Sequence, residues 1–226
     1  MQEQTANTES RQRLLHAALR CFAEHGYEKT STRMIAEAAQ ANVAAIRYYF
    51  GDKAGIYRAA FTEPMGQPQD DIALFDDPKL TLEQALQGLY SGFIEPLKMG
   101  ELVQLCTKLH MREMVEPTGL WQHEIDHGIT PYHQALVKVL CRHLGITKED
   151  DDVHRLAICI VAQAVFLYMG REVLQAVRPR LVSSPAALDV MGQRLTQYAQ
   201  ALVRAEQQRR RAAPASSRRQ FEGKKK

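Results

Sequence analysis

Apolar residues recur with the spacing of an α-helix along almost the whole chain, and this periodicity limits the possible folds more than any other feature. One helix face, for example, is formed by Leu14, Leu15, Ala18, Leu19 and Phe22. The alternating β-branched runs that are typical of strands do not occur. The pattern predicts helices over residues 9–24, 32–39, 43–49, 52–62, 81–98, 101–115, 119–127, 131–144, 149–177 and 185–211. We therefore expect an all-α protein.

Turn-forming residues divide this helical chain into unequal parts. Pro64, Gly66 and Pro68 cluster after the fourth predicted helix, where they favour a loop. The last stretch, RRRAAPASSRRQFEGKKK, lacks the apolar residues that packing requires. We expect an N-terminal domain over residues 1–62, a larger domain over 63–211 and a basic disordered tail over 212–226.

The charge is distributed unevenly over these parts. Residues 1–62 carry 8 Lys/Arg against 6 Asp/Glu, residues 63–203 carry 12 against 18, and residues 204–226 carry 9 against 2. An acidic middle part repels phosphate, so a nucleic acid would have to contact the N-terminal part or the tail.

Several features favour a cytoplasmic protein without a membrane partner. The first residues, MQEQTANTESRQR, are polar and do not form a secretion signal. The four cysteines are far apart in the sequence, which is typical of reduced thiols rather than a disulfide framework. The apolar stretch from Ala157 to Gly170 is shorter than the roughly 20 residues of a membrane span, so we expect a core helix there.

Two short predicted helices near the N-terminus have the features of a helix-turn-helix. Ser31 or Thr30 can cap the first helix, whose inward residues are Ile35, Ala36 and Ala39. Asn42 can cap the second helix, whose inward residues are Ile46 and Phe50. Two capped helices joined by a tight turn form this motif.

The outward residues of the second helix suit the major groove of DNA. Val43, Ala44 and Ala45 are small and allow close approach to base edges, and Arg47 can reach a guanine or a phosphate. One of the tyrosines, Tyr48 or Tyr49, also points outward. Lys53 falls in the first turn of the next helix, where the helix N-terminus also attracts phosphate.

The stretch GYEKTSTRMIAEAAQANVAAIRYYFGDKAGIY, residues 26–57, resembles the DNA-binding domain of the TetR family of transcriptional regulators, and its later part resembles the CecR-like branch. The resemblance implies that Thr32, Tyr49 and Lys53 contact the DNA backbone and that Arg33 contacts a base or a phosphate. Together, the motif and the resemblance give the candidate DNA-binding residues Ser31, Thr32, Arg33, Asn42, Val43, Ala44, Ala45, Arg47, Tyr48, Tyr49 and Lys53. The chain departs from the family pattern at Gln40, where Gly is usual, and at Arg47, where Tyr is usual.

The resemblance also implies a repressor that binds palindromic operator DNA as a homodimer and is released by a small-molecule effector, with no cofactor and no enzyme activity. Two apolar stripes on the last long helices are candidates for the dimer interface, although either could be intrachain core: Leu156, Ile160, Ala164, Tyr168, Leu188, Met191, Leu195, Tyr198 and Leu202. Adaptable apolar residues with polar neighbours place the candidate ligand site within residues 101–144, at His110, Met111, Arg112, Met114, Trp121 and His123, although these could instead be core and solvated surface.

A second hypothesis is a zinc-dependent hydrolase. His123, Glu124 and His127 form an H-E-x-x-H motif, and His133 falls where a third ligand would follow. However, no strand is predicted to hold a substrate, and position 130 is Thr where the extended motif has Gly. We therefore disfavour this hypothesis and leave open whether His123, His127 or His133 binds a metal.

Overall fold

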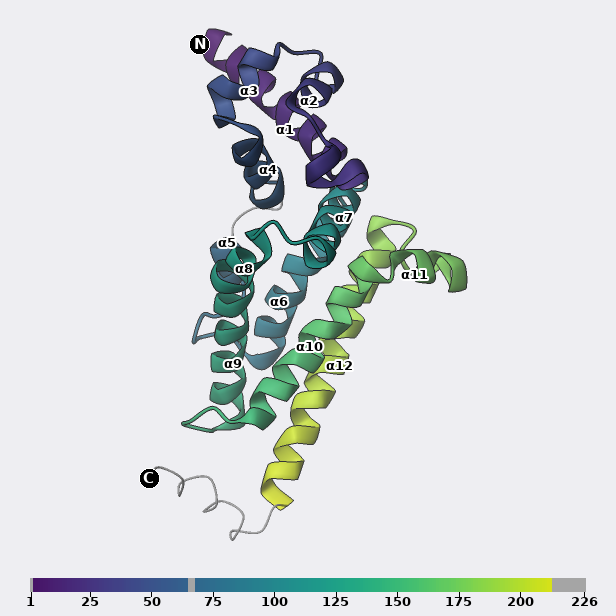
Figure 1. Cartoon of the computed structure of the whole chain (residues 1–226). Helices are drawn as coiled ribbons and strands as arrows, with labels where there is room; N and C mark the ends of the chain where they lie inside the picture. Colours follow the sequence, from purple (N-terminus) through teal and green to yellow (C-terminus); the bar gives the residue numbers. More distant parts are fainter. Residues whose placement is uncertain (1, 65–67, 213–226) are drawn as a thin grey trace, which may run out of the picture.

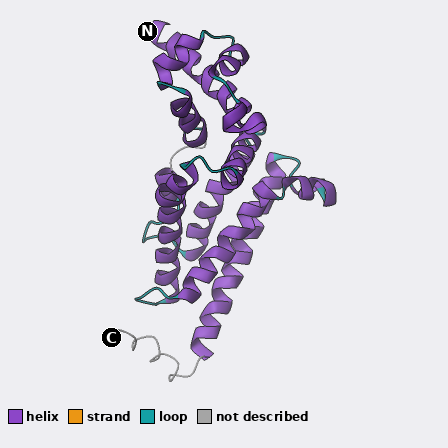
Figure 2. Cartoon of the chain, in the orientation of Figure 1, coloured by secondary structure: helices purple, strands orange, loops and turns teal. Residues whose placement is uncertain are grey.

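The computed structural model describes residues 2–64 and 68–212, and within these ranges it contains helices and no strand (Figure 2). The N-terminal unit, which we call the head, consists of α1 (Gln2–Lys29), α2 (Thr32–Ala38), α3 (Val43–Phe50) and α4 (Lys53–Thr62). The remainder, which we call the body, consists of α5 (Pro68–Ala73), α6 (Leu82–Leu97), α7 (Glu101–Val115), α8 (Leu120–Glu124), η1 (Ile125–Ile129), α9 (Thr130–Leu144), α10 (Asp151–Met169), α11 (Arg171–Val177), η2 (Pro179–Leu181) and α12 (Pro185–Ala212). The all-α prediction is confirmed. Residues 213–226, which make up most of the predicted tail, lie outside the described residues.

The body is an elongated bundle, and the head sits at one end of it (Figure 1). Helix α6 packs along α12, and α10 packs against both α9 and α12. Tyr90 of α6 is almost completely buried, and its hydroxyl donates a hydrogen bond to the carbonyl oxygen of Ile160 in α10 at 3.1 Å. The apolar faces of these four helices form one continuous core.

The head has a second core that is not made by the head alone. Phe22 of α1, Ile35 of α2 and Ile46 of α3 are buried together. Helix α7 of the body adds Leu105, Cys106 and Leu109 to the same cluster. The core of the head therefore extends beyond the domain boundary predicted at residue 62. Helix α7 follows that boundary in the sequence, but it packs with the helices of the head.

Several helix boundaries differ from the sequence-based prediction. Helix α1 begins at Gln2 rather than at residue 9, and its helical geometry is interrupted at Gly26, where φ is 78°. Helix α5 lies in a stretch that was predicted to be a loop. The single helix predicted over residues 149–177 is divided at Gly170 into α10 and α11.

The chain stays helical through residues 125–130, where a break between two helices was predicted. The segment Ile125–Ile129 forms one π-helical turn that joins α8 to α9. Pro131 explains both the prediction and the outcome, because proline lacks an N–H and its ring collides with the carbonyl of the residue four positions earlier. A wider π turn relieves that collision without ending the helix, and such turns are frequent at functional sites.

Helix α10 has 19 residues, more than the apolar stretch that the sequence suggested. By length and composition alone it is able to cross a membrane, the one helix of the described part of the chain for which this holds. In the fold, however, Val153, Ile160 and Ala164 lie in the core of the body. Their packing against α6, α9 and α12 accounts for the apolar character of this side of α10.

Candidate nucleic-acid interface and cavity

Side-chain caps define each end of the predicted helix-turn-helix. The hydroxyl of Ser31 accepts from the backbone N–H of Met34 at 3.1 Å and so begins α2. The side chain of Asn42 begins α3 in the same way, accepting from Ala44 N–H at 2.8 Å. Thr30, the alternative cap, is instead buried, and its hydroxyl donates to the carbonyl of Gly26 at 2.7 Å. The helix-turn-helix and the Ser31 cap are thus present as predicted.

The turn between α2 and α3 keeps its geometry without the usual glycine. Gln40 has a φ of 51°, the only non-glycine residue with positive φ in the described chain. The turn is closed by a hydrogen bond from Ala41 N–H to the carbonyl of Ala36 at 2.9 Å. A side chain in this left-handed conformation is strained by about 1–2 kcal/mol. The departure at Gln40 therefore changes the stability of the turn rather than its shape.

Helix α3 presents the expected face to solvent. Val43, Ala44, Arg47 and Tyr48 are exposed, Tyr48 at 74%. Ala45 is half-buried, while Ile46 is buried beneath this face. The side chain of Arg47 makes no hydrogen bond or ion pair with any described residue. An unpaired guanidinium beside small side chains leaves room for a base edge or a phosphate.

The flanking candidates already have partners within the head. Arg33 forms an ion pair with Glu37 at 2.8 Å on the surface of α2, close to the half-buried Thr32.

Tyr49 donates a hydrogen bond to the side chain of Asn7 near the start of α1. The ammonium of Lys53 lies 4.3 Å from the centre of the Tyr27 ring. These contacts hold both side chains beside the exposed end of α3.

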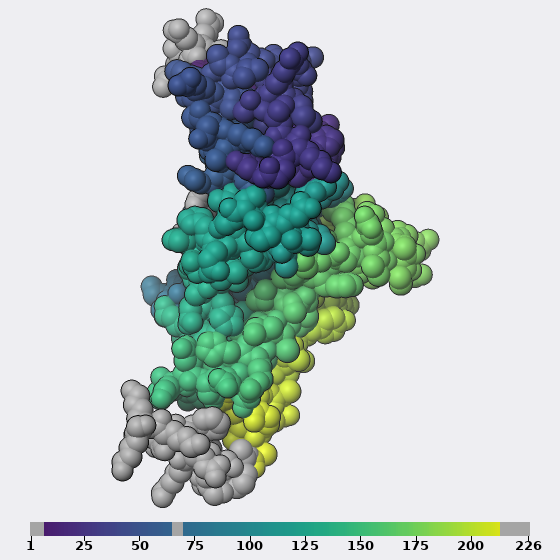
Figure 3. Space-filling model, in the orientation of Figure 1, coloured from purple at the N-terminus to yellow at the C-terminus, as the bar shows by residue number. Residues whose placement is uncertain are grey.

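A cavity of about 990 Å³ lies where the head meets the body. It is lined by residues from α4 to α10, and the surface is hollowed between α8 and α10 (Figure 3). Its apolar wall includes Phe61, Phe93, Ile129, Ile158, Val161 and Val165. Its polar wall includes Arg58, Asp71, His110, His123, Glu124, His127, Tyr132 and His133.

The predicted ligand residues are only partly brought together by this cavity. His110 and His123 line it. Met111 and Met114 are exposed on α7 and do not line it. Trp121 packs against the core of the head. The sequence periodicity of α7 could not show which of its residues line the cavity, because the cavity depends on how α7 crosses α4 and α10.

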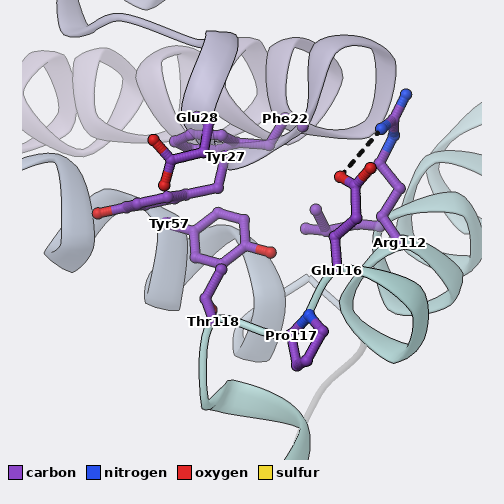
Figure 4. Close-up of a pocket in the computed structure, with 10 residues that line it drawn as sticks. Phe22, Tyr27, Glu28, Tyr57, Arg112, Glu116, Pro117 and Thr118 are labelled. Carbon is purple, nitrogen blue, oxygen red and sulfur yellow. Dashed lines mark ion pairs between the residues drawn. The ribbon is translucent and has the colours of Figure 1, made fainter.

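Arg112 has a different place from the one predicted. Its guanidinium donates to the carbonyls of Ala23 and Glu24 at 2.9 and 2.8 Å, just before the interruption of α1 at Gly26. It also lines a separate cavity of about 420 Å³ between α1, α4 and α7, where it pairs with Glu116 at 3.7 Å (Figure 4). Arg112 thus caps a helix of the head from the body.

The sequence analysis missed a buried carboxylate at the same junction. Glu113 is completely buried and accepts a hydrogen bond from the hydroxyl of Tyr57 in α4 at 2.7 Å. It also accepts from Thr118 N–H at 2.7 Å and Leu120 N–H at 3.0 Å, which caps the start of α8. Burial first, and then the hydrogen bond to Glu113, raise the pKa of Tyr57. The signal in the sequence was the position of Glu113 four residues after Leu109, on the buried stripe of α7.

The histidines of the H-E-x-x-H motif and the residues that follow it are arranged in pairs. The rings of His123 and His127 lie 4.1 Å apart, and His133 shares a hydrogen bond of 2.9 Å with His154 of α10. Glu124, the general base of the hydrolase hypothesis, folds back so closely over its own helix that a Cβ at Gly128 would be 2.5 Å from its Oε1. No cluster of three or more His, Cys, Asp or Glu able to hold a metal occurs in residues 2–64 and 68–212.

Most of the predicted dimer stripes are used inside the protomer. The residues with little surface left for a partner are Leu156, Ile160, Ala164, Leu188 and Leu195. Tyr168 and Met191 are half-buried against the same core. Only Tyr198 and Leu202 of this set are exposed, and the five buried residues form intrachain core, the alternative that the sequence left open. Periodicity alone does not distinguish a core stripe from an interface stripe, because both are apolar.

Comparison with known proteins agrees with the two-part fold. Residues 14–60 match the bacterial regulatory proteins of the tetR family, and residues 82–206 match the C-terminal domain of the HTH-type transcriptional dual regulator CecR. CecR of Shigella flexneri is 25% identical over 177 residues, which cover 74% of this chain and 78% of CecR. The HTH-type transcriptional repressor AcnR of Corynebacterium glutamicum is 46% identical over 56 residues, which cover 25% of this chain and 30% of AcnR.

Solved structures show the same fold at low sequence identity. The fatty acid degradation regulator FadR from Bacillus halodurans superimposes with a TM-score of 0.61 at 18% identity, covering 84% of this chain and 94% of FadR. A TetR-like transcriptional regulator from Rhodococcus sp. RHA1 gives 0.54 at 19% identity, covering 85% and 96%. The matched families are transcriptional regulators and not enzymes, which rules out the zinc hydrolase. The chain belongs to the TetR family of transcriptional regulators, with a C-terminal domain of the CecR type.

Proposed function

We propose that this regulator is a homodimeric repressor that binds a palindromic operator in the cytoplasm and is released from it by a small molecule. The observation that carries the proposal is the exposed, capped face of α3 with its unpaired Arg47. We assign DNA binding to residues 1–62, ligand binding and dimerisation to residues 63–211, and an auxiliary electrostatic contact to the basic tail.

The DNA contacts follow from the exposed surface of the head. Val43, Ala44 and Ala45 approach base edges, and Arg47 reads a base. Phosphate contacts come from the side chains around this face and from the helix N-termini capped by Ser31 and Asn42. The phosphate-contacting side chains are Thr32, Arg33, Tyr48, Tyr49 and Lys53. Arg33 and Lys53 exchange their present partners for phosphate.

A second copy covers the apolar surface that α10, α11 and α12 leave exposed. This surface contains Phe166, Met169, Val173, Val177, Val190, Tyr198 and Leu202. An exposed apolar surface favours association, and paired half-sites require a two-fold protein. The interface we propose therefore keeps Tyr198 and Leu202 from the sequence prediction and takes its other residues from the exposed sides of α10, α11 and α12.

The effector binds in the 990 Å³ cavity, because α4 forms part of its wall through Arg58, Phe61 and Thr62. The same helix begins at Lys53 beside the DNA-binding face. A ligand that favours one orientation of α4 thereby changes the distance between the two heads of the dimer. It releases DNA only if it binds the DNA-free arrangement more tightly.

Selection of genomic fragments with the purified protein tests the DNA-binding and dimer proposals together. We expect an inverted repeat with half-sites about one helical turn apart. Arg47→Ala should weaken operator binding by about 1–3 kcal/mol and relax the preference at one base pair. Lys79→Ala, which removes a charge from an exposed loop of the body, is the matched control. Equal effects of the two substitutions would count against a reading role for Arg47.

The dimer surface has its own test. Phe166→Glu places a charge on the exposed face of α10 and should convert the dimer to a monomer in sedimentation experiments. Val115→Glu places the same charge on an exposed valine of α7 and should leave the dimer intact. A Phe166→Glu protein that stays dimeric would move the interface elsewhere.

A further inference from the structure

The cavity contains a carboxylate that has no partner among the described residues. Asp71 of α5 lines the cavity and is half-buried, and its side chain makes no hydrogen bond or ion pair with any described residue. Its Oδ1 lies against the backbone of α6, only 3.3 Å from where a Cβ at Gly92 would be. Burial first, and then the neighbouring Asp70, raise the pKa of Asp71. The carboxylate of Asp71 therefore has no cation in contact with it among the described residues.

Two aromatic rings line the same cavity as this carboxylate. Phe93 and Tyr132 both line the cavity, with their ring centres 5.8 Å apart and edge to face. The ring centre of Tyr168 lies 6.4 Å from that of Phe93. Burial raises the pKa of both tyrosines, and the charge of Asp71 raises it further. A carboxylate together with aromatic faces is the combination that attracts organic cations.

Three hydroxyls at or beside the cavity wall already donate to backbone carbonyls. The hydroxyl of Tyr132 donates to the carbonyl of Leu89, and that of Tyr168 donates to the carbonyl of Phe93. Thr62 likewise donates to the carbonyl of Arg58. These three hydroxyls are therefore not free to bind an anionic ligand, and the carboxylate of Asp71 would repel it.

Two histidines add hydrogen-bond acceptors to the wall. The Nδ1 of His110 lies 2.8 Å from the carbonyl of Cys106, and the Nδ1 of His127 lies 3.0 Å from the carbonyl of His123. A carbonyl only accepts, so in each neutral ring Nδ1 carries the proton and Nε2 is an acceptor. For His110, burial lowers the pKa and favours this neutral form.

We propose that the cavity takes a lipophilic organic cation, with its charge near Asp71 and the rings of Phe93 and Tyr132 and its apolar body against α10. This assignment deepens the proposed effector site and rests on it for its regulatory meaning. Ile158, Val161 and Val165 of α10 supply the apolar surface for the body of the ligand. A cation with an apolar body fits both halves of the wall.

Tetraphenylphosphonium and tetraphenylborate test the sign of the charge, because they share size and shape and differ only in charge. Titration calorimetry with the full DNA-free protein should show the phosphonium binding at least about tenfold more tightly than the borate. Asp71→Asn should weaken phosphonium binding about tenfold and leave borate binding unchanged or tighter. Asp70→Asn, on the exposed side of the same helix, is the matched control and should change neither.

Phe93→Leu provides a second variant that keeps the apolar volume and removes one ring, and it should weaken only the phosphonium. Thermal unfolding of each variant shows that the fold is intact. Equal or tighter binding of the borate, no binding of either ion, or equal effects of the Asp71 and Asp70 substitutions would overturn the assignment. Operator release is measured separately by fluorescence anisotropy. If the phosphonium binds through Asp71 and the operator is not released, the ligand class stands and the effector role fails.

Discussion

Gln40 occupies a backbone conformation that L-residues rarely adopt, in the turn that sets the angle between α2 and α3. Its side chain is exposed, so only the backbone is constrained. Gln40→Gly should relieve the left-handed strain while adding flexibility to the unfolded chain. We expect a net increase of about 0.5–1 kcal/mol in the free energy of unfolding.

Urea unfolding of Gln40→Gly and Gln40→Ala measures this effect. The alanine variant keeps the Cβ and should not be stabilised. If both variants shift the unfolding midpoint alike, the side chain of Gln40 and not its backbone is responsible.

At the residue scale, the sequence predicts what depends on local geometry. Ser31 and Asn42 could be identified as caps because a cap needs only its own side chain and an amide two or three residues later. Glu113 and Asp71 could not be assigned in the same way. Their surroundings come from α4, α8 and α6, which the chain brings together only after folding.

At the scale of single helices, α10 and α12 are joined by an ion-pair network at the end of the body distant from the head. Asp150 caps α10 through the N–H of Val153 at 3.0 Å, and it pairs with Arg210 of α12 at 2.8 Å. Arg210 in turn pairs with Glu206. Arg210 lowers the pKa of Asp150 from 3.8 to about 2.

Asp150→Asn should therefore destabilise the protein in a pH-dependent way. Asparagine still caps the helix, so only the charge is lost, and the partly exposed pair contributes up to about 1 kcal/mol at neutral pH. Because the pKa of Asp150 is lower in the folded state than the ordinary value of 3.8, the charged carboxylate stabilises the fold at pH values above 3.8. This stabilisation is lost as the pH falls from 3.8 through about 2. Unfolding free energies at pH 6 and pH 2.5 should show the difference between wild type and variant shrinking. A constant difference would point to the cap instead of the charge.

The predicted boundaries of single helices fail where one residue has two opposed effects. Pro131 ends many helices, but here a π turn accommodates it and α8 continues through η1 into α9. Gly170 lies within the helix predicted over residues 149–177, yet α10 ends there and α11 begins. Both outcomes depend on neighbouring helices that local sequence does not describe.

At the scale of the whole molecule, the hydroxyl of Tyr57 and the carboxylate of Glu113 link the head to the body. Tyr57→Phe removes one charge-assisted hydrogen bond from a buried carboxylate and should lower the free energy of unfolding by about 1–3 kcal/mol. Tyr48→Phe, at an exposed tyrosine, should change it by less than about 0.5 kcal/mol. Fluorescence of Trp121, the single tryptophan, reports on this junction during urea unfolding. Equal stability of the two variants would show that the link carries no free energy.

The contribution of α7 to the core of the head also limits how this regulator can be rebuilt. The simplest hybrid regulator would exchange the head for another DNA-binding module at the linker after α4. Here such an exchange would leave Leu105, Cys106 and Leu109 facing a foreign partner. A workable chimera would therefore have to exchange residues 1–62 together with the matching face of α7, or redesign that face to suit the new module.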